Sequence, residues 1–165
     1  MIALLAFVTL QRLAELIHAR RNTRRLLAEG AVEIGADHYP LLVMLHASWL
    51  AANWGLVISG HASLWLPAVI GYAAIEMARI WVMASLGRYW TTRILVPREA
   101  PLVRRGPYRF LKHPNYWVVV GEIALLPLAL GSWTLAAIFS VLNAAILYWR
   151  IRVEEGSLAP RRNAA

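Results

Sequence analysis

The sequence contains no cysteine, which excludes disulfide scaffolds, thiolate zinc sites, iron–sulfur clusters and cysteine nucleophiles. Its ten glycines never occur as Gly-x-Gly, and neither a dinucleotide-binding fingerprint nor a P-loop is present. Charged residues make up only 16% of the chain, against roughly a quarter in an ordinary soluble domain. Hydrophobic residues make up 59% of the 165 residues. We therefore expect one integral membrane domain over residues 1–165.

Five stretches approach the length of about 20 apolar residues that a membrane-spanning helix needs. They are residues 2–19, 39–59, 64–86, 116–130 and 133–149. The first stretch has no basic residue before it and no small-residue cleavage pattern after it, which argues against a cleaved signal peptide. The sequence therefore predicts an all-α integral membrane protein with five transmembrane helices.

The basic residues gather in three of the segments outside these stretches. Residues 20–27 contain four Arg, residues 87–115 contain six Arg and one Lys, and the tail 150–165 contains four Arg. The short connections 60–63 and 131–132 contain none. Because cytoplasmic loops are enriched in Lys and Arg, we predict an external N-terminus and a cytoplasmic C-terminus. This topology accounts for the net charge of +8, so no nucleic-acid partner is expected.

Five ionisable side chains fall inside the predicted spans, where charge is costly and usually faces a bundle interior or a water-filled cavity. They are Arg12, Glu15, Glu76, Arg79 and Glu122. The spacing allows an ion pair within one helix for Arg12–Glu15 and for Glu76–Arg79. Glu122 needs a partner from another helix, such as Arg79 or Arg12. The sequence leaves open whether these groups are structural ion pairs or contacts to a substrate.

Two polar stripes run along other predicted spans. Tyr39, His46 and Asn53 recur every seven residues, and we interpret them as interhelical hydrogen-bonding groups. No second His or carboxylate stands four residues from His46, so no metal site is expected. Arg150 and Glu154 continue a stripe of the last span into the tail.

The segment 102–116 leads into the fourth span and concentrates several chemically reactive groups. Pro114 fits the first turn of a helix, which puts His113, Asn115 and Tyr116 at a helix N-terminus, where free N–H groups favour an anion. Basic and aromatic residues surround this point. S-adenosylmethionine carries a carboxylate, a flat ring and a sulfonium that suit such a site. Contact with anionic lipid is the alternative interpretation of a basic loop beside a membrane.

Two sequence blocks carry a resemblance to a known family. Gly-Pro-Tyr-Arg at 106–109 precedes Lys-His-Pro-Asn-Tyr at 112–116, and Arg-Val-Glu-Glu-Gly-Ser-Leu follows the last span at 152–158. Together they resemble the signature of the isoprenylcysteine carboxyl methyltransferase family. The N-terminal part is similar to the small bacterial branch of that family, which includes enzymes that O-methylate alkylpyrones. The resemblance implies a multispan enzyme of the bacterial inner membrane that uses S-adenosylmethionine, with its active site facing the cytoplasm.

The resemblance also implies roles for particular residues. Cofactor binding is expected at Tyr108, His113, Pro114, Asn115, Tyr116, Glu154 and Glu155. We assign catalytic roles to Arg79, Glu122 and Arg150, and substrate contacts to Arg12, Glu15 and Trp90. The acceptor is expected to be a carboxylate or an acidic enol on a prenyl- or alkyl-bearing molecule that arrives through membrane lipid.

Methyl transfer to such an acceptor does not need a strong general base from the protein. A carboxylate or acidic enol is already ionised at neutral pH, so alignment and exclusion of water matter more than a strong base. Arg79 or Arg12 would hold the acceptor oxygen, and Glu122 or Glu154 would take the proton of a neutral hydroxyl.

Two other functions fit the same sequence features. One is an NADPH-dependent membrane reductase of similar architecture, and the other is a non-enzymatic membrane scaffold or small transporter. The sequence identifies neither the acceptor molecule nor whether the chain forms a homo-oligomer.

Overall fold

The structure is a computed structural model that describes residues 1–97 and 103–162, with the side chains at 38 and 157–162 left aside. Arg98 of the predicted loop and residues 163–165 of the predicted tail lie outside the described residues. The helices are α1 (Ile2–Ala28), α2 (Tyr39–Ile58), α3 (Leu66–Leu86), α4 (Pro114–Ala129) and α5 (Trp133–Arg162). Three single turns of 3-10 helix are η1 (Ala36–His38), η2 (Gly87–Tyr89) and η3 (Gly106–Arg109).

Four of the described helices, α1, α2, α3 and α5, are long and apolar enough to cross a membrane. Helix α4 has 16 residues, which at 1.5 Å per residue gives roughly 24 Å, less than the hydrocarbon thickness of about 30 Å. Many large apolar side chains on the long helices are exposed, among them Phe7, Met77 and Val141. The predicted all-α membrane architecture is therefore confirmed, whereas the count of five spans stays a prediction.

Two helices extend well beyond the apolar stretches that predicted them. Helix α1 continues past residue 19 to Ala28, and α5 continues past residue 149 to Arg162. Hydropathy locates only the part of a helix that lies in lipid. Arg is a good helix former whose long side chain reaches water, so the backbone hydrogen bonds continue through these basic segments.

A short antiparallel ladder, which the sequence analysis did not predict, joins two distant segments. Strand β1 (Val32–Ile34) pairs with β2 (Ile94–Val96), with Val32 opposite Val96 and Ile34 opposite Ile94. Arg93 Nη1 binds both carboxylate oxygens of Glu33, at 2.6 and 2.8 Å. The ladder therefore ties the α1–α2 connection to the chain that follows α3.

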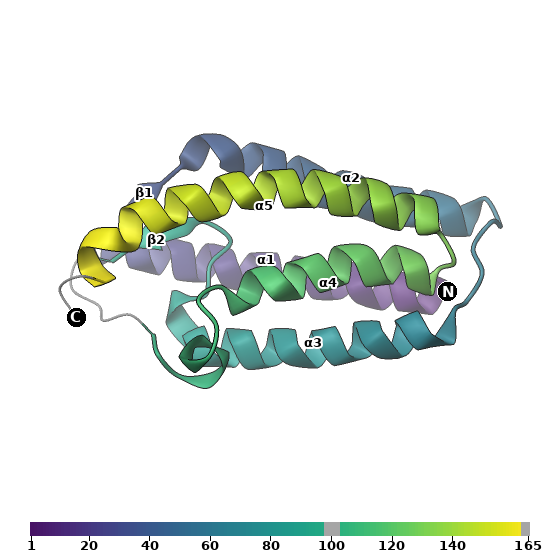
Figure 1. Ribbon diagram of the computed structural model, residues 1–165, viewed down its shortest axis with the longest axis horizontal. Coiled ribbons are helices and arrows are strands. Elements are labelled where there is room, and N and C mark those ends of the chain that lie inside the picture. The colour runs from purple at the N-terminus through teal and green to yellow at the C-terminus, as the bar shows by residue number, and fades with distance from the viewer. Residues whose placement is uncertain (98–102, 163–165) are drawn as a thin grey trace.

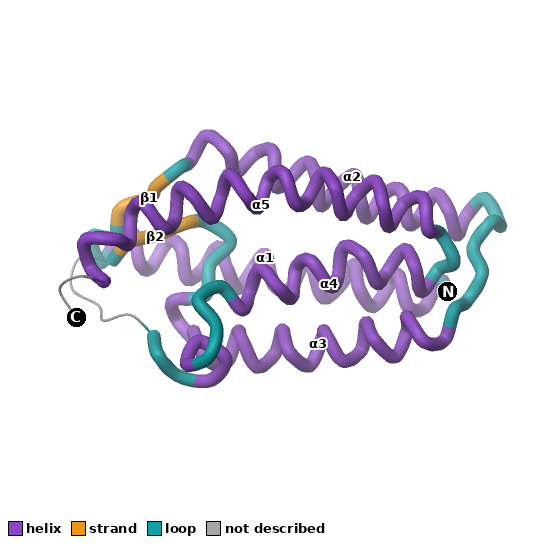
Figure 2. The backbone as a smooth tube through the Cα atoms, in the orientation of Figure 1, coloured by secondary structure: helices purple, strands orange, loops and turns teal. Residues whose placement is uncertain are grey.

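The five helices lie side by side along the long axis of the molecule (Figure 1). The N-terminus and the connections 59–65 and 130–132 lie at one end (Figure 2). The strands, η3 and the C-terminal part of α5 lie at the other end, which we call the loop end. The basic C-terminal part of α1 and the basic segment that follows α3 thus meet at the loop end.

An apolar cluster lies between the helices. Its buried members come from all five helices and are Leu5, Val8, Leu45, Trp49, Tyr72, Ile123, Leu126, Leu130 and Phe139. Helices α3 and α4 approach closely at Gly121, where a Cβ atom would lie 2.8 Å from Ile75 Cδ1.

The polar stripe on α2 differs from the predicted arrangement. His46 Nδ1 lies 2.8 Å from the carbonyl oxygen of Leu42, and Asn53 Nδ2 donates to the carbonyl oxygen of Trp49 at 2.8 Å. These two side chains therefore bond within their own helix, because a carbonyl one turn back is within reach. Tyr39 does reach another segment, since its hydroxyl lies 3.1 Å from Thr92 Oγ1.

Candidate active site

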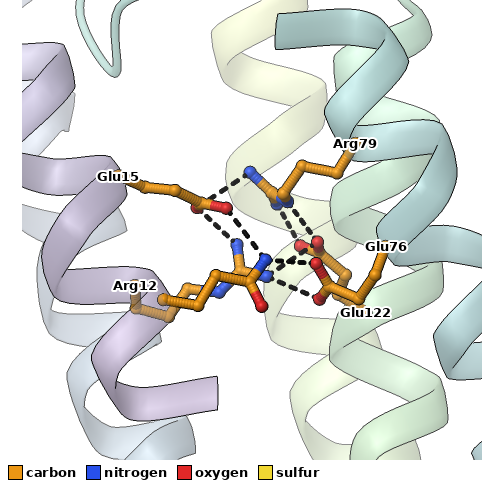
Figure 3. A network of polar contacts seen from close by, with 6 residues as sticks. Arg12, Glu15, Glu76, Arg79 and Glu122 are labelled. Atoms are coloured by element: carbon orange, nitrogen blue, oxygen red, sulfur yellow. Dashed lines mark hydrogen bonds and ion pairs between the residues drawn. The ribbon is translucent and has the colours of Figure 1, made fainter. Parts of the chain in front are cut away.

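A buried ion network joins α1, α3 and α4 (Figure 3). Arg12 is at its centre. Its Nη1 lies 2.8 Å from Glu15 Oε2, and its Nη2 lies 2.8 Å from Glu76 Oε1 and 2.9 Å from Glu122 Oε1. The predicted Arg12–Glu15 pair is confirmed, and Glu76 is paired with Arg12 of another helix.

The second guanidinium of the network is that of Arg79. Its Nε and Nη2 donate to the two carboxylate oxygens of Glu122, and its Nη1 lies 3.2 Å from Glu15 Oε2. Glu122 thus has the partners from other helices that the sequence predicted. Two guanidinium groups and three carboxylates satisfy most of one another's hydrogen bonds here, as buried charges require.

A cavity of about 310 Å³ lies against this network, between α1, α2 and α5. We call it the helix cavity. Arg12, Glu15 and Arg79 line one part of it, and the apolar part is lined by Leu13, Leu16, Leu42, Val43, Ala47, Leu50, Val119 and Leu147. Such a cavity suits an apolar chain that carries one polar head group. Glu122 is not among its lining residues, because it lies behind the two arginines.

A second cavity, of about 360 Å³, lies at the loop end, and we call it the loop cavity. Basic side chains line it at Arg93, Arg104 and Lys112. Tyr89 and Tyr108 add aromatic surface. Burial raises the pKa of Tyr108, and the nearby charge of Glu154 adds to the shift, so this phenol stays neutral. The volume falls within the range of about 300–1,000 Å³ that is typical of small-molecule sites.

The two cavities share one wall. Five residues line both of them, and these are Trp90, Thr91, Asn115, Tyr116 and Arg150. They come from the segment after α3, from the first turn of α4 and from α5. A ligand in one cavity would therefore lie next to a ligand in the other, because the same five residues border both. We call these five residues the shared wall.

The shared wall is held together by hydrogen bonds. Arg150 Nε donates to the Tyr116 hydroxyl at 3.0 Å, and Arg150 Nη2 donates to the carbonyl oxygen of Thr92 at 2.8 Å. The Tyr116 hydroxyl in turn donates to Glu154 Oε2. The arginine and the carboxylate of α5 therefore both fix the orientation of this tyrosine.

The N-terminus of α4 also contacts the C-terminal part of α5. His113 Nε2 lies 3.4 Å from Glu155 Oε1, and His113 Nδ1 lies 3.8 Å from Glu154 Oε2. The His113 ring stacks on Tyr116 with 5.4 Å between ring centroids. The two sequence blocks, about 40 residues apart along the chain, thus meet in space as the resemblance implied.

The predicted cofactor residues divide into two groups. Tyr108, His113, Asn115, Tyr116 and Glu154 all line the loop cavity. Pro114 and Glu155 lie beside it without lining it: Pro114 is buried at the start of α4, and Glu155 contacts His113. The sequence reasoning missed Thr91, Arg93 and Arg104 as lining residues. Thr91 and Arg93 stand in the polar segment that follows the third apolar stretch, and this segment is the sequence signal that could have identified them.

Gly106 explains how the Gly-Pro-Tyr-Arg block is positioned. Its φ of +58° is in the left-handed region, and a Cβ atom there would lie 2.0 Å from Ser85 Oγ. Arg105 Nε donates to the carbonyl oxygen of Ser85 at 2.8 Å. Only glycine permits this close approach, which holds η3 and therefore Tyr108 against the end of α3.

Three buried polar atoms of the shared wall have no hydrogen-bond partner within the described residues. They are Trp90 Nε1, Asn115 Oδ1 and Arg150 Nη1. Buried polar groups are nearly always paired, so orphaned donors and acceptors beside a cavity indicate a place where a ligand binds.

Comparisons with known proteins agree with this geometry. Residues 68–160 match the Isoprenylcysteine carboxyl methyltransferase (ICMT) family. "Uncharacterized protein YpbQ" of Bacillus subtilis (strain 168) is 39% identical over 158 residues, which cover 94% of this chain and 94% of that protein. An "Uncharacterized protein" of Haemophilus influenzae is 25% identical over 143 residues, or 84% of this chain and 83% of that protein. No solved structure matches the chain significantly.

Proposed function

Because the chain belongs to the isoprenylcysteine carboxyl methyltransferase family, we propose that it is an S-adenosylmethionine-dependent O-methyltransferase of the membrane. In this proposal the methyl donor binds in the loop cavity and a lipophilic acceptor binds in the helix cavity. The observation that carries the proposal is the shared wall, because its five residues border both a polar cavity and an apolar cavity and so bring the two sites next to each other.

The residues of the loop cavity fit the chemical groups of S-adenosylmethionine. Arg93, Arg104 and Lys112 suit its carboxylate, and Glu154 suits its ammonium or ribose hydroxyls. Tyr108 and Tyr116 offer aromatic faces, which favour both an adenine ring and a sulfonium. The orphaned Asn115 Oδ1 supports a role for this residue as a hydrogen-bond acceptor for the donor molecule.

The helix cavity supports an acceptor with a long apolar tail. Its lining from α1 and α2 is largely aliphatic, and Leu13 and Val43 of this lining are also exposed on the outside of the bundle. A prenyl or alkyl chain would therefore pass between α1 and α2 into lipid, while its polar head lies against the shared wall.

When bound, S-adenosylmethionine would supply an electrophilic methyl group for an oxygen nucleophile, with its sulfur leaving as a neutral thioether. The protein's part is to align the acceptor and keep water out. Arg150 is buried in the shared wall and would hold a carboxylate or enolate oxygen as a charge-assisted hydrogen-bond donor. If the acceptor is a neutral hydroxyl, Tyr116 and Glu154 form a route by which its proton leaves.

Arg79 and Glu122 have a different part in the proposal. They stand next to the helix cavity within a network that joins three helices. We propose that this network sets the shape of the inner end of the cavity. The membrane topology that we propose has five spans, an external N-terminus and a cytoplasmic loop end, supported by the basic segments that gather there.

One experiment tests the proposed activity directly. The purified protein in lipid nanodiscs is incubated with a membrane lipid extract and S-adenosylmethionine that carries a deuterated methyl group, and the extract is analysed by mass spectrometry. We expect at least one lipophilic compound to gain the labelled methyl group. The His113→Ala variant is expected to lose both this product and the calorimetric signal of donor binding. His61→Ala is the matched control, because His61 is exposed at the opposite end.

The same preparation distinguishes the alternative functions. Calorimetric binding of NADPH in place of S-adenosylmethionine would support a membrane reductase. Binding of neither molecule, together with no labelled product, would support a non-enzymatic scaffold and refute the proposal.

A further inference from the structure

We propose that Trp90 and Arg150 together bind the reacting oxygen of the acceptor, and that Asn22 of α1 is the positioning residue that holds Trp90 in place. This inference rests on the proposed function and deepens it, because it identifies the subsite that receives the acceptor head group.

The ion network is a poor place for an anionic or electron-rich oxygen. Its two arginines face three carboxylates, so its formal charge is −1 before any ligand binds. Arg12 keeps one unpartnered Nε atom, yet its charge is already compensated by three carboxylates. A further negative charge beside the network would be repelled. The acceptor oxygen therefore needs donors from elsewhere around the helix cavity.

Two such donors belong to residues of the shared wall. Trp90 Nε1 and Arg150 Nη1 are both buried and unpartnered within the described residues. The exposed fractions of the two residues are 3% and 6%. The other polar atoms of Arg150 bond the uncharged Tyr116 hydroxyl and Thr92 carbonyl. A buried indole N–H normally has a partner, so its absence here indicates a group that arrives with the acceptor.

Trp90 is fixed in this position by α1. Asn22 Nδ2 donates to the carbonyl oxygen of Trp90 at 2.8 Å and to that of Gly87 at 3.3 Å. The same nitrogen lies 3.2 Å from His18 Nε2. The His18 ring stacks on the indole of Trp90, with 5.8 Å between centroids and 27° between planes. Helix α1 thus holds both the backbone and the ring of this tryptophan.

The arrangement assigns a clear task to each donor. The indole N–H and the guanidinium N–H each donate to the acceptor oxygen from the wall. A lone pair of that oxygen stays directed toward the loop cavity, which the same wall residues line. As the new oxygen–carbon bond forms, the carbon–sulfur bond of the methyl donor breaks and its electron pair stays on sulfur.

Indole ¹⁵N NMR of the wild-type protein in nanodiscs tests the subsite without any need for activity. The eight tryptophans give resolvable N–H signals, and Trp90→Phe identifies that of Trp90. Myristate and para-nonylphenol serve as probes of an apolar tail with a carboxylate or a hydroxyl head. We expect the Trp90 signal to move downfield with at least one probe, and the signal of Trp117, which lines neither cavity, to stay in place. A Trp90 signal that is unmoved by saturating amounts of both probes overturns the inference.

Kinetics supply the second measurement. Trp90→Phe keeps an aromatic ring but removes the N–H, so kcat/KM for the acceptor should fall roughly tenfold to a hundredfold with donor affinity unchanged. Trp117→Phe, an exposed position, is the matched control and should keep full activity. Asn22→Leu should lower kcat more than it raises KM, and Asn22→Gln should recover part of the loss.

The outcomes separate this inference from the proposed function. Full activity of Trp90→Phe refutes the subsite and leaves the methyltransferase assignment standing. A wild-type protein that transfers no methyl group refutes the assignment, while the Trp90 signal still decides whether a lipophilic oxygen ligand binds at the shared wall.

Discussion

Arg150 Nε donates a hydrogen bond of 3.0 Å to the hydroxyl of Tyr116, and this bond joins α5 to α4 at the wall between the two cavities. The same hydroxyl donates to Glu154 one turn further along α5. A guanidinium and a carboxylate of α5 therefore both bond the one phenol of α4. These two hydrogen bonds fix the position of Tyr116, which lines both cavities.

Removal of the Tyr116 hydroxyl should weaken methyl transfer. Tyr116→Phe leaves Arg150 and Glu154 without their common partner, and hydrogen bonds to charged groups contribute about 1.5–3 kcal/mol each. We expect kcat/KM to fall roughly tenfold to a hundredfold, measured by transfer of a labelled methyl group. Tyr148→Phe is the control, because Tyr148 is exposed and its hydroxyl accepts hydrogen bonds from the exposed Arg152. Equal activity of the two variants would contradict this account of the wall.

Loss of one carboxylate from the buried ion network should destabilise the bundle. Glu122→Gln removes the carboxylate that both Arg79 and Arg12 contact and leaves Arg79 with its longer contact to Glu15, at a cost of about 3–5 kcal/mol. Thermal unfolding in detergent measures the effect. Glu29→Gln removes a carboxylate from the exposed pairs with Arg25 and Arg88 and should change stability by less than about 1 kcal/mol. The idea fails if the two substitutions have the same effect.

A methyl group at Gly106 should disturb the loop cavity. Gly106→Ala introduces a Cβ atom 2.0 Å from Ser85 Oγ at a positive φ, so η3 must move away from α3. We expect weaker donor binding by at least about tenfold, measured by calorimetry, and a lower unfolding temperature. Gly55→Ala is the control, since nothing lies within 4 Å of its Cβ position in α2. That control should be neutral or stabilising by up to about 1 kcal/mol.

Stability at alkaline pH should depend on Tyr108. Burial raises the pKa of this phenol above its ordinary value of 10.0, so the folded protein binds the proton more tightly than the unfolded chain does. The stabilisation that this group contributes is therefore fully present below pH 10.0, the ordinary pKa of the phenol, and is lost as the pH rises above that value. Tyr108→Phe should show a smaller decline in unfolding temperature between about pH 9 and pH 11 than the wild type or Tyr148→Phe. An unchanged decline would count against a buried, neutral Tyr108.

The proposed orientation in the membrane is open to chemical labelling. The chain has no cysteine, so single introduced thiols react without background. In intact bacterial cells a membrane-impermeant maleimide should label His61→Cys, in the connection 59–65 opposite the loop end. It should not label Arg109→Cys at the loop end. Both positions are exposed in the structure. The reverse labelling pattern would invert the topology.

Much of the fold follows from local sequence patterns. The apolar stretches predicted the positions of all five helices, because hydropathy reports directly on which residues avoid water. Helices α1 and α5 continue nine and thirteen residues beyond the predicted spans, since helical hydrogen bonding continues beyond the apolar layer. The β1–β2 ladder was missed because a three-residue strand gains its stability only from a partner far along the chain.

By itself, the sequence determined the membrane class, the two blocks around His113 and Glu154, and the need of Glu122 for a partner on another helix. These features depend on residue type and short spacing. The tertiary structure alone decided that Trp90 and Arg150 meet in one wall, that Glu76 pairs with Arg12, and that two cavities lie back to back. The physical reason is that these contacts join residues dozens of positions apart, and only the packing of the five helices sets the distances between them.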